Sequence, residues 1–140
     1  MKNYIITAFL CFFTTVNFAQ DITWEKDFPK ALRSAEQIDA LLLMHFTDGS
    51  ESSIEKNIKR NILKSKKFKR AIKKSIIILH VDESVSSLNK DFNKRVISTY
   101  NENKKFPAIR VIIPKSRKSA SLLSKFNDKD IEDYILEINS

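Results

Sequence analysis

The apolar positions of this chain fall into two kinds of run. Three runs are short and nearly continuous, at 40–46, 76–81 and 108–113. A continuous apolar run of this length predicts a strand that is buried on both faces of a sheet. The runs between them place apolar residues three or four positions apart, which predicts amphipathic helices.

These helices alternate with the strands along the chain. Asp27 is a candidate N-cap for the first helix, with Pro29 in its first turn, and Ser65 is a candidate N-cap for a later one. Asn127 or Asp128 begins the last. The apolar positions that define the helices are Phe28, Ala31, Leu32 and Ala35; Ile54, Ile58 and Ile62; Phe68, Ala71 and Ile72; Leu88, Phe92, Val96 and Tyr100; and Ile131, Tyr134, Ile135 and Ile138.

After the third strand, 115–118 predicts a polar turn and 121–126 predicts a fourth strand at the edge of the sheet. Because this connection is short, the last two strands should be antiparallel. Strands that alternate with helices predict an α/β protein. We expect a three-layer α/β/α sandwich with a central mixed sheet of about four strands.

The N-terminus has the pattern of a signal peptide. Lys2 supplies a positive charge, 4–16 is almost wholly apolar or small, and Ala19 is a small residue before a cleavage point at Gln20. The apolar run is shorter than the roughly 20 residues that a membrane-spanning helix needs. We therefore predict a signal peptide at 1–19 and one exported domain at 20–140, periplasmic or secreted, without a transmembrane span after cleavage. An uncleaved N-terminal anchor is the alternative.

Several motifs occur in a suggestive order. Trp24 and an Ala-rich helix precede a strand that ends in Phe46-Thr47, a helix and a Val-Asp-terminated strand follow at 68–82, and Phe106-Pro107 precedes the third strand. In this order the chain resembles the thioredoxin-like family, especially exported thioredoxin-like domains of bacterial envelopes. The resemblance implies the thioredoxin fold. It also implies a cis bond at Pro107, in a loop that packs against the helix beginning at Ser52.

The family's two redox cysteines would align near Ser52 and Glu55. Cys11 is the only cysteine and lies in the predicted signal peptide. Dithiol exchange needs an attacking thiolate and a second thiol, so the mature chain lacks this chemistry. Instead, Ser52-Ser53-Ile54-Glu55 has the Ser-x-x-Glu pattern of a capping box, in which Glu55 would reach back to the Ser52 amide. We interpret the segment as a structural helix start, and a retained ligand site is the alternative.

Other catalytic motifs are absent from the sequence. Gly49 is the only glycine, which excludes a P-loop and a dinucleotide fingerprint, and no Gly-x-Ser-x-Gly occurs. His45 and His80 each lie in a predicted strand and could border a site, although such residues are more often half-buried and hydrogen-bonded. Their spacing fits no zinc motif. We expect no catalytic residue, no metal and no cofactor.

The chain has a formal net charge of +8, and its cations concentrate in one region. No acid interrupts this basic run, which consists of Lys56, Lys59, Arg60, Lys64, Lys66, Lys67, Lys69, Arg70, Lys73 and Lys74. It could bind an anionic partner such as lipid headgroups or cell-surface polysaccharide, or simply keep the protein soluble. Export and the lack of an aromatic stacking platform disfavour nucleic acid.

Three functional hypotheses follow. The first is a non-catalytic binding or adaptor module of the cell envelope. It would hold another protein or an extended polypeptide in a groove formed by Ser52, Ser53, Phe106 and Pro107. The second is an electrostatic binder of anionic surfaces through the basic run. The third is a divergent enzyme of the thioredoxin family.

Overall fold

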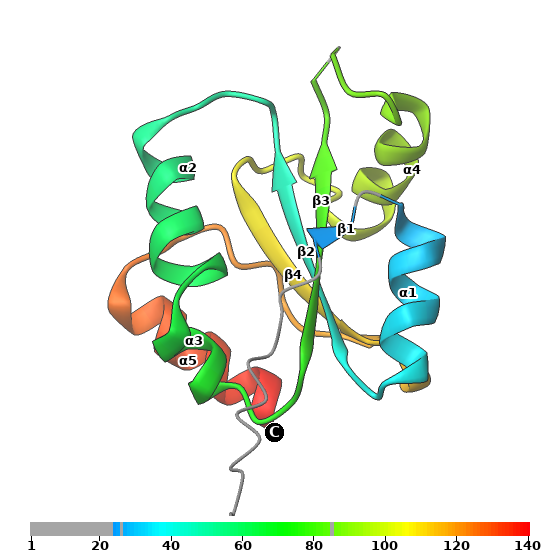
Figure 1. The fold of residues 1–140 in the computed structure, drawn as a ribbon. Helices are drawn as coiled ribbons and strands as arrows, with labels where there is room; N and C mark the ends of the chain where they lie inside the picture. Colours follow the sequence, from blue (N-terminus) through cyan, green and yellow to red (C-terminus); the bar gives the residue numbers. More distant parts are fainter. Residues whose placement is uncertain (1–23, 26, 85) are drawn as a thin grey trace, which may run out of the picture.

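The computed structural model describes residues 24–140 except 26 and 85, so the predicted signal peptide lies outside the described residues. A five-stranded sheet forms the centre, in the order β1-β3-β2-β4-β5. β1 and β3 run parallel to β2, and β4 is antiparallel to both β2 and β5. The strands are β1 (Trp24–Glu25), β2 (Leu41–Thr47), β3 (Ile76–Asp82), β4 (Ala108–Ile113) and β5 (Lys118–Ser119) (Figure 1).

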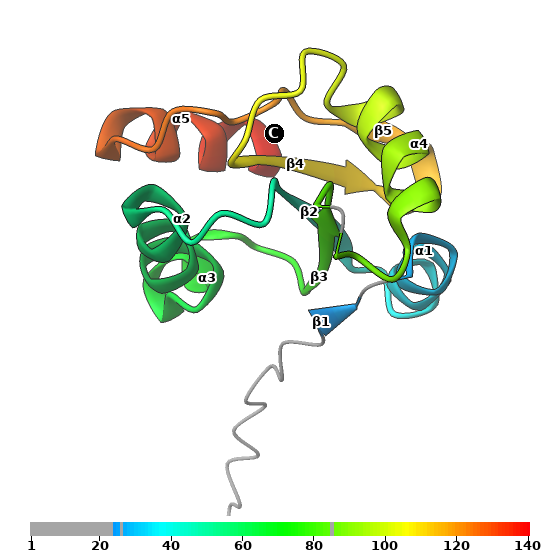
Figure 2. The same cartoon turned by 90° about the horizontal axis from the view of Figure 1, so that it is seen from above.

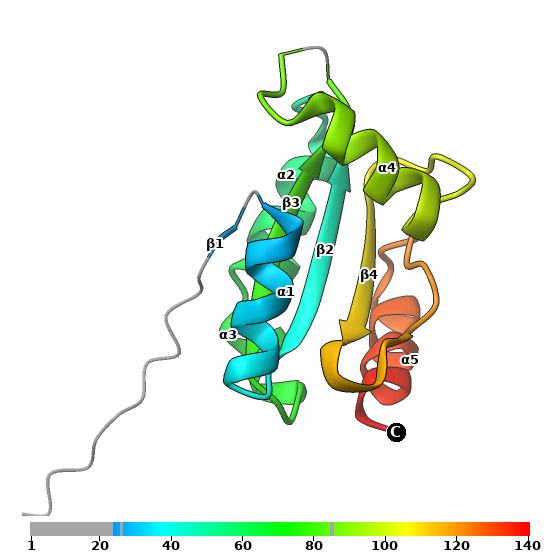
Figure 3. The same ribbon diagram turned by 90° about the vertical axis from the view of Figure 1, so that its right-hand side faces the viewer.

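Helices cover both faces of this sheet. α1 and α4 lie on one face, and α2, α3 and α5 lie on the other (Figures 2 and 3). The predicted α/β/α sandwich with a mixed sheet is therefore confirmed, with two-residue strands added at both edges. The helices are α1 (Phe28–Gln37), α2 (Ser53–Ile58), the π-helical turn η1 (Lys59–Leu63), α3 (Lys66–Ala71), α4 (Lys90–Tyr100), the 3-10 turn η2 (Pro114–Ser116) and α5 (Asp128–Asn139).

The central strands are buried on both faces, as their continuous apolar runs predict. All seven residues of β2 are buried. Leu42, Met44 and Phe46 pack toward α1 and α4, whereas Leu41 and Leu43 pack toward α2, α3 and α5. This alternation follows from the two-residue period of a strand. It places His45, the next residue in the second series, under the α2 layer.

Side-chain caps begin the helices where the sequence indicates them. Asp27 accepts the Lys30 amide at 3.2 Å and Pro29 lies in the first turn of α1. Ser65 accepts the Phe68 amide, and Asn127 accepts the Asp130 amide. Each cap satisfies one of the amides that the first turn leaves without a helical partner.

The prediction of an edge strand at 121–126 is wrong. The edge strand is Lys118–Ser119, and the later segment contributes only a bridge between Leu123 and Ile109, offset by one residue from the β4–β5 register. The reason lies in α5: the buried Tyr134 hydroxyl accepts the Val111 amide at 3.0 Å. The Ser121 amide does not pair with β4 either, because it donates to Glu137 Oε1 on α5 at 2.7 Å.

Two helix predictions also need correction. Leu88 is 100% exposed and precedes α4, which begins only at Lys90. The predicted helix through Ile54, Ile58 and Ile62 is not one regular α-helix, because α2 ends at Ile58 and the wider π-helical turn η1 follows it. None of the described helices combines the length and apolarity that a bilayer crossing requires.

Candidate functional site

The start of α2 confirms half of the predicted capping box. Ser52 is the N-cap, with φ −61° and ψ 160°, and its Oγ accepts the Glu55 amide at 3.1 Å. The expectation that the Glu55 carboxylate reaches back to the Ser52 amide is wrong. That side chain turns inward to the sheet, where a buried histidine offers a closer partner.

Glu55 and His45 form a buried pair beneath α2. Glu55 is 2% exposed and His45 is 0% exposed. Glu55 Oε1 lies 2.8 Å from His45 Nε2, although the two atoms are not aligned for a straight hydrogen bond. Burying a carboxylate is costly unless a polar or charged partner accompanies it, so His45 explains why Glu55 can occupy this position.

His80 extends this pair toward solvent. His45 on β2 and His80 on β3 are direct neighbours in the parallel register, and their Nδ1 atoms lie 3.2 Å apart. His80 is half-buried. Burial lowers the pKa of His80, and the nearby His45 lowers it further because two positive imidazoles would repel.

One proton arrangement suits all three groups. A hydrogen bond between two neutral imidazoles needs one Nδ1 to donate and the other to accept. If His80 Nδ1 donates, His45 Nδ1 accepts and the proton of His45 lies on Nε2, facing the Glu55 carboxylate. We call Glu55, His45 and His80 the buried polar cluster.

The sequence did not reveal this cluster. His45 and His80 were expected as separate strand histidines, and Glu55 as part of a surface cap. The two-residue alternation along β2 places His45 under the α2 layer, but only the register between β2 and β3 brings His80 beside it. No three histidine, cysteine or carboxylate side chains among the described residues gather closely enough to hold a metal ion.

The loop between β2 and α2 is fixed by local contacts. Gly49 has φ +80°, a backbone conformation that favours glycine, and its amide donates to Thr47 Oγ1 at 3.1 Å. A Cβ at this position would lie 2.7 Å from Ser84 Cβ. The only glycine of the chain therefore lets the β2–α2 loop approach the loop that follows β3.

The chain enters β4 at the end of the sheet where β2 ends and this loop begins, because Ala108 pairs with Phe46 in the antiparallel register. The Phe106–Pro107 bond is cis, as the resemblance implies. Ala108 pairs with Phe46, so Pro107 enters the sheet next to Thr47, the last residue of β2 before the loop that leads to Ser52. Phe106 packs against the core on the α1 and α4 side.

The basic run covers α2, η1, α3 and the chain that follows. Among the described residues, one cation of the basic run makes an ion pair: Lys74 lies 3.9 Å from Asp39. Eight of the ten cations are exposed, and Lys59 and Lys69 are half-buried. The run is therefore a solvent-facing surface with little local neutralisation.

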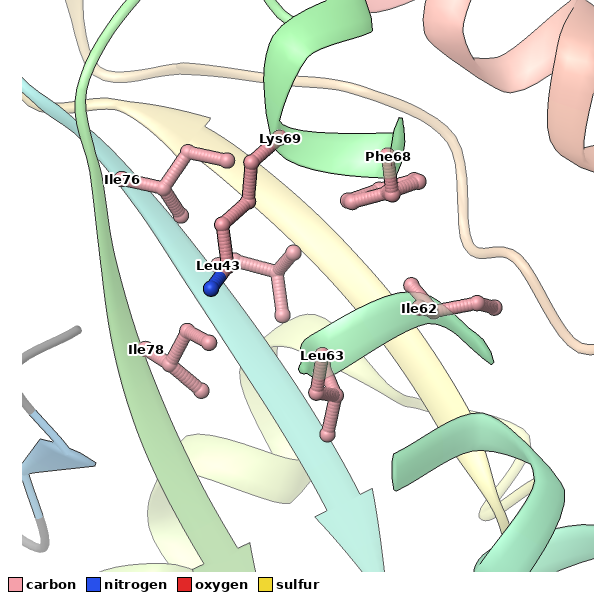
Figure 4. A pocket seen from close by; sticks show the side chains of 7 residues that line it. All are labelled: Leu43, Ile62, Leu63, Phe68, Lys69, Ile76 and Ile78. Carbon is pink, nitrogen blue, oxygen red and sulfur yellow. The ribbon is translucent and has the colours of Figure 1, made fainter. Parts of the chain in front are cut away.

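Lys69 differs from the other cations of the run. Its side chain reaches down from α3 beside Leu43, Ile76 and Ile78 (Figure 4). Burial lowers the pKa of Lys69, and the neighbouring Lys66 lowers it further. The cavity there measures about 10 Å³, which is room for one water molecule at most. Lys69 therefore packs its stem against the sheet and marks no ligand pocket.

Comparison with known proteins identifies the fold. No family model matches this chain, and no curated protein matches it. Solved structures do: an oxidoreductase named DsbH is 16% identical over 82% of this chain and 85% of its own, with a TM-score of 0.62. A disulphide isomerase from Xylella fastidiosa Temecula1 is 17% identical over 80% and 88%, with a TM-score of 0.58.

A thioredoxin from Thermus thermophilus is similar as well, at 14% identity over 81% of this chain and 84% of its own, with a TM-score of 0.56. At these identities the likeness concerns the fold. The chain has a thioredoxin-like fold, as its sequence resemblance implies, and its one cysteine, Cys11, leaves it without a dithiol pair.

Proposed function

We propose that this protein is a redox-inactive thioredoxin-like binding module, exported to the cell envelope, that holds an extended polypeptide. The binding surface consists of Ser52, Ser53, Phe106 and Pro107. The pattern of 1–19 supports export, since a positive start, an apolar run and a small residue before Gln20 are the features of a cleaved signal.

One observation carries the binding proposal. The backbone amide and carbonyl of Phe106 make no hydrogen bond within the described part of the chain, although the next residues enter the sheet. An extended peptide can pair with such groups by strand addition, and main-chain hydrogen bonds then supply affinity. Ser53, which is exposed at the start of α2, would border the peptide on the other side.

The buried polar cluster supports the non-catalytic part of the proposal. In this structure the first turn of α2 is secured by the Ser52 cap and by the contact between Glu55 and His45. Both of these are structural contacts that need no thiol. Reduction of insulin by the purified protein should therefore not exceed the blank, and turnover that depends on Ser52 would favour a divergent enzyme.

A permanently unfolded probe tests the binding surface. Reduced and carboxymethylated α-lactalbumin supplies extended polypeptide without thiols. We expect it to bind the protein, and we expect Ser53→Trp to weaken binding about tenfold because the indole would occupy the peptide's path. Ser98→Trp is the matched control, since Ser98 is exposed on α4, on the other face of the sheet. Equal binding by both variants, or none by the parent, would refute the surface.

The exposure of the basic run favours a second candidate, binding to anionic surfaces. Lys64, Lys66 and Lys67 are exposed and have no ion pair among the described residues. Binding to phosphatidylglycerol vesicles should fall steeply with salt, since the Debye length is about 8 Å at physiological ionic strength. Changing these three lysines to Glu should abolish it. Salt-independent binding, or no binding at low salt, would contradict this candidate.

A further inference from the structure

A groove separates α5 from the layer formed by α2, η1 and α3, and we call it the α2–α5 groove. Its volume is about 920 Å³. Its lining residues come from α2, η1 and α3 on one wall and from α5 and the segment just before it on the other. Figure 2 shows α5 facing α2 and α3 on the same side of the sheet. The groove is distinct from the Phe106 surface, since neither Phe106 nor Pro107 lines it.

The floor of the groove is apolar and so is part of its mouth. Ile58, Ile62 and Phe68 are buried beneath it. Ile54 is 53% exposed and Leu136 is 68% exposed, and both line the groove. These are two of the few large apolar side chains that the described chain leaves in water, and they stand on opposite walls.

The two walls also differ in charge. Lys67 lines the wall formed by α3, and Arg60 donates to Asn57 of the same wall at 3.0 Å. Asp128 and Glu132 line the opposite wall on α5, with Lys125 just before the helix. Between residues 24 and 140 as described, no ion pair crosses the groove. Lys67 on one wall, and Asp128 and Glu132 on the other, therefore make no ion pair among the described residues.

We propose that a second copy of this chain docks in the α2–α5 groove, about a two-fold axis that runs parallel to the groove. Rotation about that axis places the basic wall of each protomer opposite the acidic wall of its partner. An axis across the groove would instead oppose like charges. Leu136 and Ile54 of each protomer then enter the apolar groove of the other, as an isologous interface requires.

The charge pattern favours a second copy over an anionic partner. A lipid headgroup or an acidic polysaccharide would be attracted to Lys67 but repelled by Asp128 and Glu132. A second copy carries both signs in the matching order. It also buries the exposed apolar side chains, which is the main driving force for association.

A charge-swap series measured by sedimentation equilibrium tests the proposal. We expect the purified chain to form dimers. Lys67→Glu and Glu132→Lys should each weaken the dimer about tenfold, because each opposes like charges at both symmetric contacts. The combined variant K67E/E132K restores opposite charges and should regain most of the parent's affinity. Leu136→Asp should leave a folded monomer, because Leu136 is exposed in the protomer.

Matched controls lie on α4, on the other face of the sheet. Lys94→Glu and Asp91→Lys make the same charge changes at exposed positions and should leave the dimer unchanged. A chain that is monomeric at every concentration overturns the proposal. So does failure of the combined variant to recover the parent's dimer affinity, or a tighter dimer for Glu132→Lys alone.

Discussion

Glu55 Oε1 lies 2.8 Å from Nε2 of His45, and this contact ties the first turn of α2 to the centre of β2. Both residues are buried, one on a helix and the other on a strand. The sequence resemblance predicts that a redox cysteine of the thioredoxin-like family would align near Glu55, and in this chain Glu55 makes a buried polar contact instead.

Removal of the Glu55 carboxylate should destabilise the protein. Glu55→Ala leaves the N–H of the neutral His45 imidazole buried without a polar partner, and an unsatisfied buried polar group costs about 1–3 kcal/mol. Urea denaturation followed by circular dichroism measures the loss. Glu51→Ala, an exposed position in the preceding loop, is the matched control and should change little.

The double variant H45L/E55L distinguishes two contributions to the free energy of unfolding: the penalty for leaving one buried polar group unpaired, and the net contribution of the paired groups. Replacing both partners by apolar residues removes the desolvation cost of both, so stability should recover to well above that of Glu55→Ala. If Glu55→Ala were as stable as the parent, the contact would not hold α2 in place.

The Ser52 cap should contribute a smaller amount. Ser52→Ala removes the acceptor of the Glu55 amide and should cost about 1 kcal/mol, as is typical of N-caps. Ser53→Ala, one residue later, removes a hydroxyl that makes no hydrogen bond among the described residues and should be nearly neutral. Equal losses in the two variants would show that the cap does not stabilise α2.

Stability should fall as the pH drops below about 6.5. The pKa of His80 is lowered in the folded state from its ordinary value of 6.5, so the unfolded chain binds more protons between the two values. The stability that neutral His80 contributes is complete above pH 6.5 and is lost as the pH falls toward the folded pKa. The charged or titratable groups that face His80 are His45 on β2, Asp82 on β3, Glu55 on α2 and Lys59 on η1.

The urea midpoint of unfolding, measured at a pH above 6.5 and at a pH below 6.5, tests this dependence of stability on His80. His80→Gln keeps a hydrogen-bonding group but does not titrate, so its midpoint should change less with pH than the parent's. Identical pH dependence in the two proteins would assign the effect to other groups.

Export should remove the N-terminal segment. Lys2, the apolar run at 4–16 and Ala19 predict cleavage before Gln20. Mass spectrometry of the protein from an envelope fraction should find an N-terminus near Gln20. A chain that retains Met1 in the membrane would instead support the uncleaved anchor.

Local patterns were enough to predict most of the fold. The continuous apolar runs identified β2, β3 and β4, because a strand buried on both faces leaves no place for polar side chains. Asp27, Ser65 and Asn127 were recognisable as caps because a cap acts within its own helical turn. The edge strand was mispredicted because Tyr134, which takes the Val111 amide, is far away in sequence.

The sequence by itself determined the absence of a dithiol pair, the density of positive charge and the resemblance that implied the fold. The tertiary structure alone decided the buried polar cluster, since His45, Glu55 and His80 come from three separate elements. It also decided the α2–α5 groove, whose walls carry Lys67 and Glu132 from distant helices. Such sites depend on strand register and helix packing, which join residues that local patterns treat as unrelated.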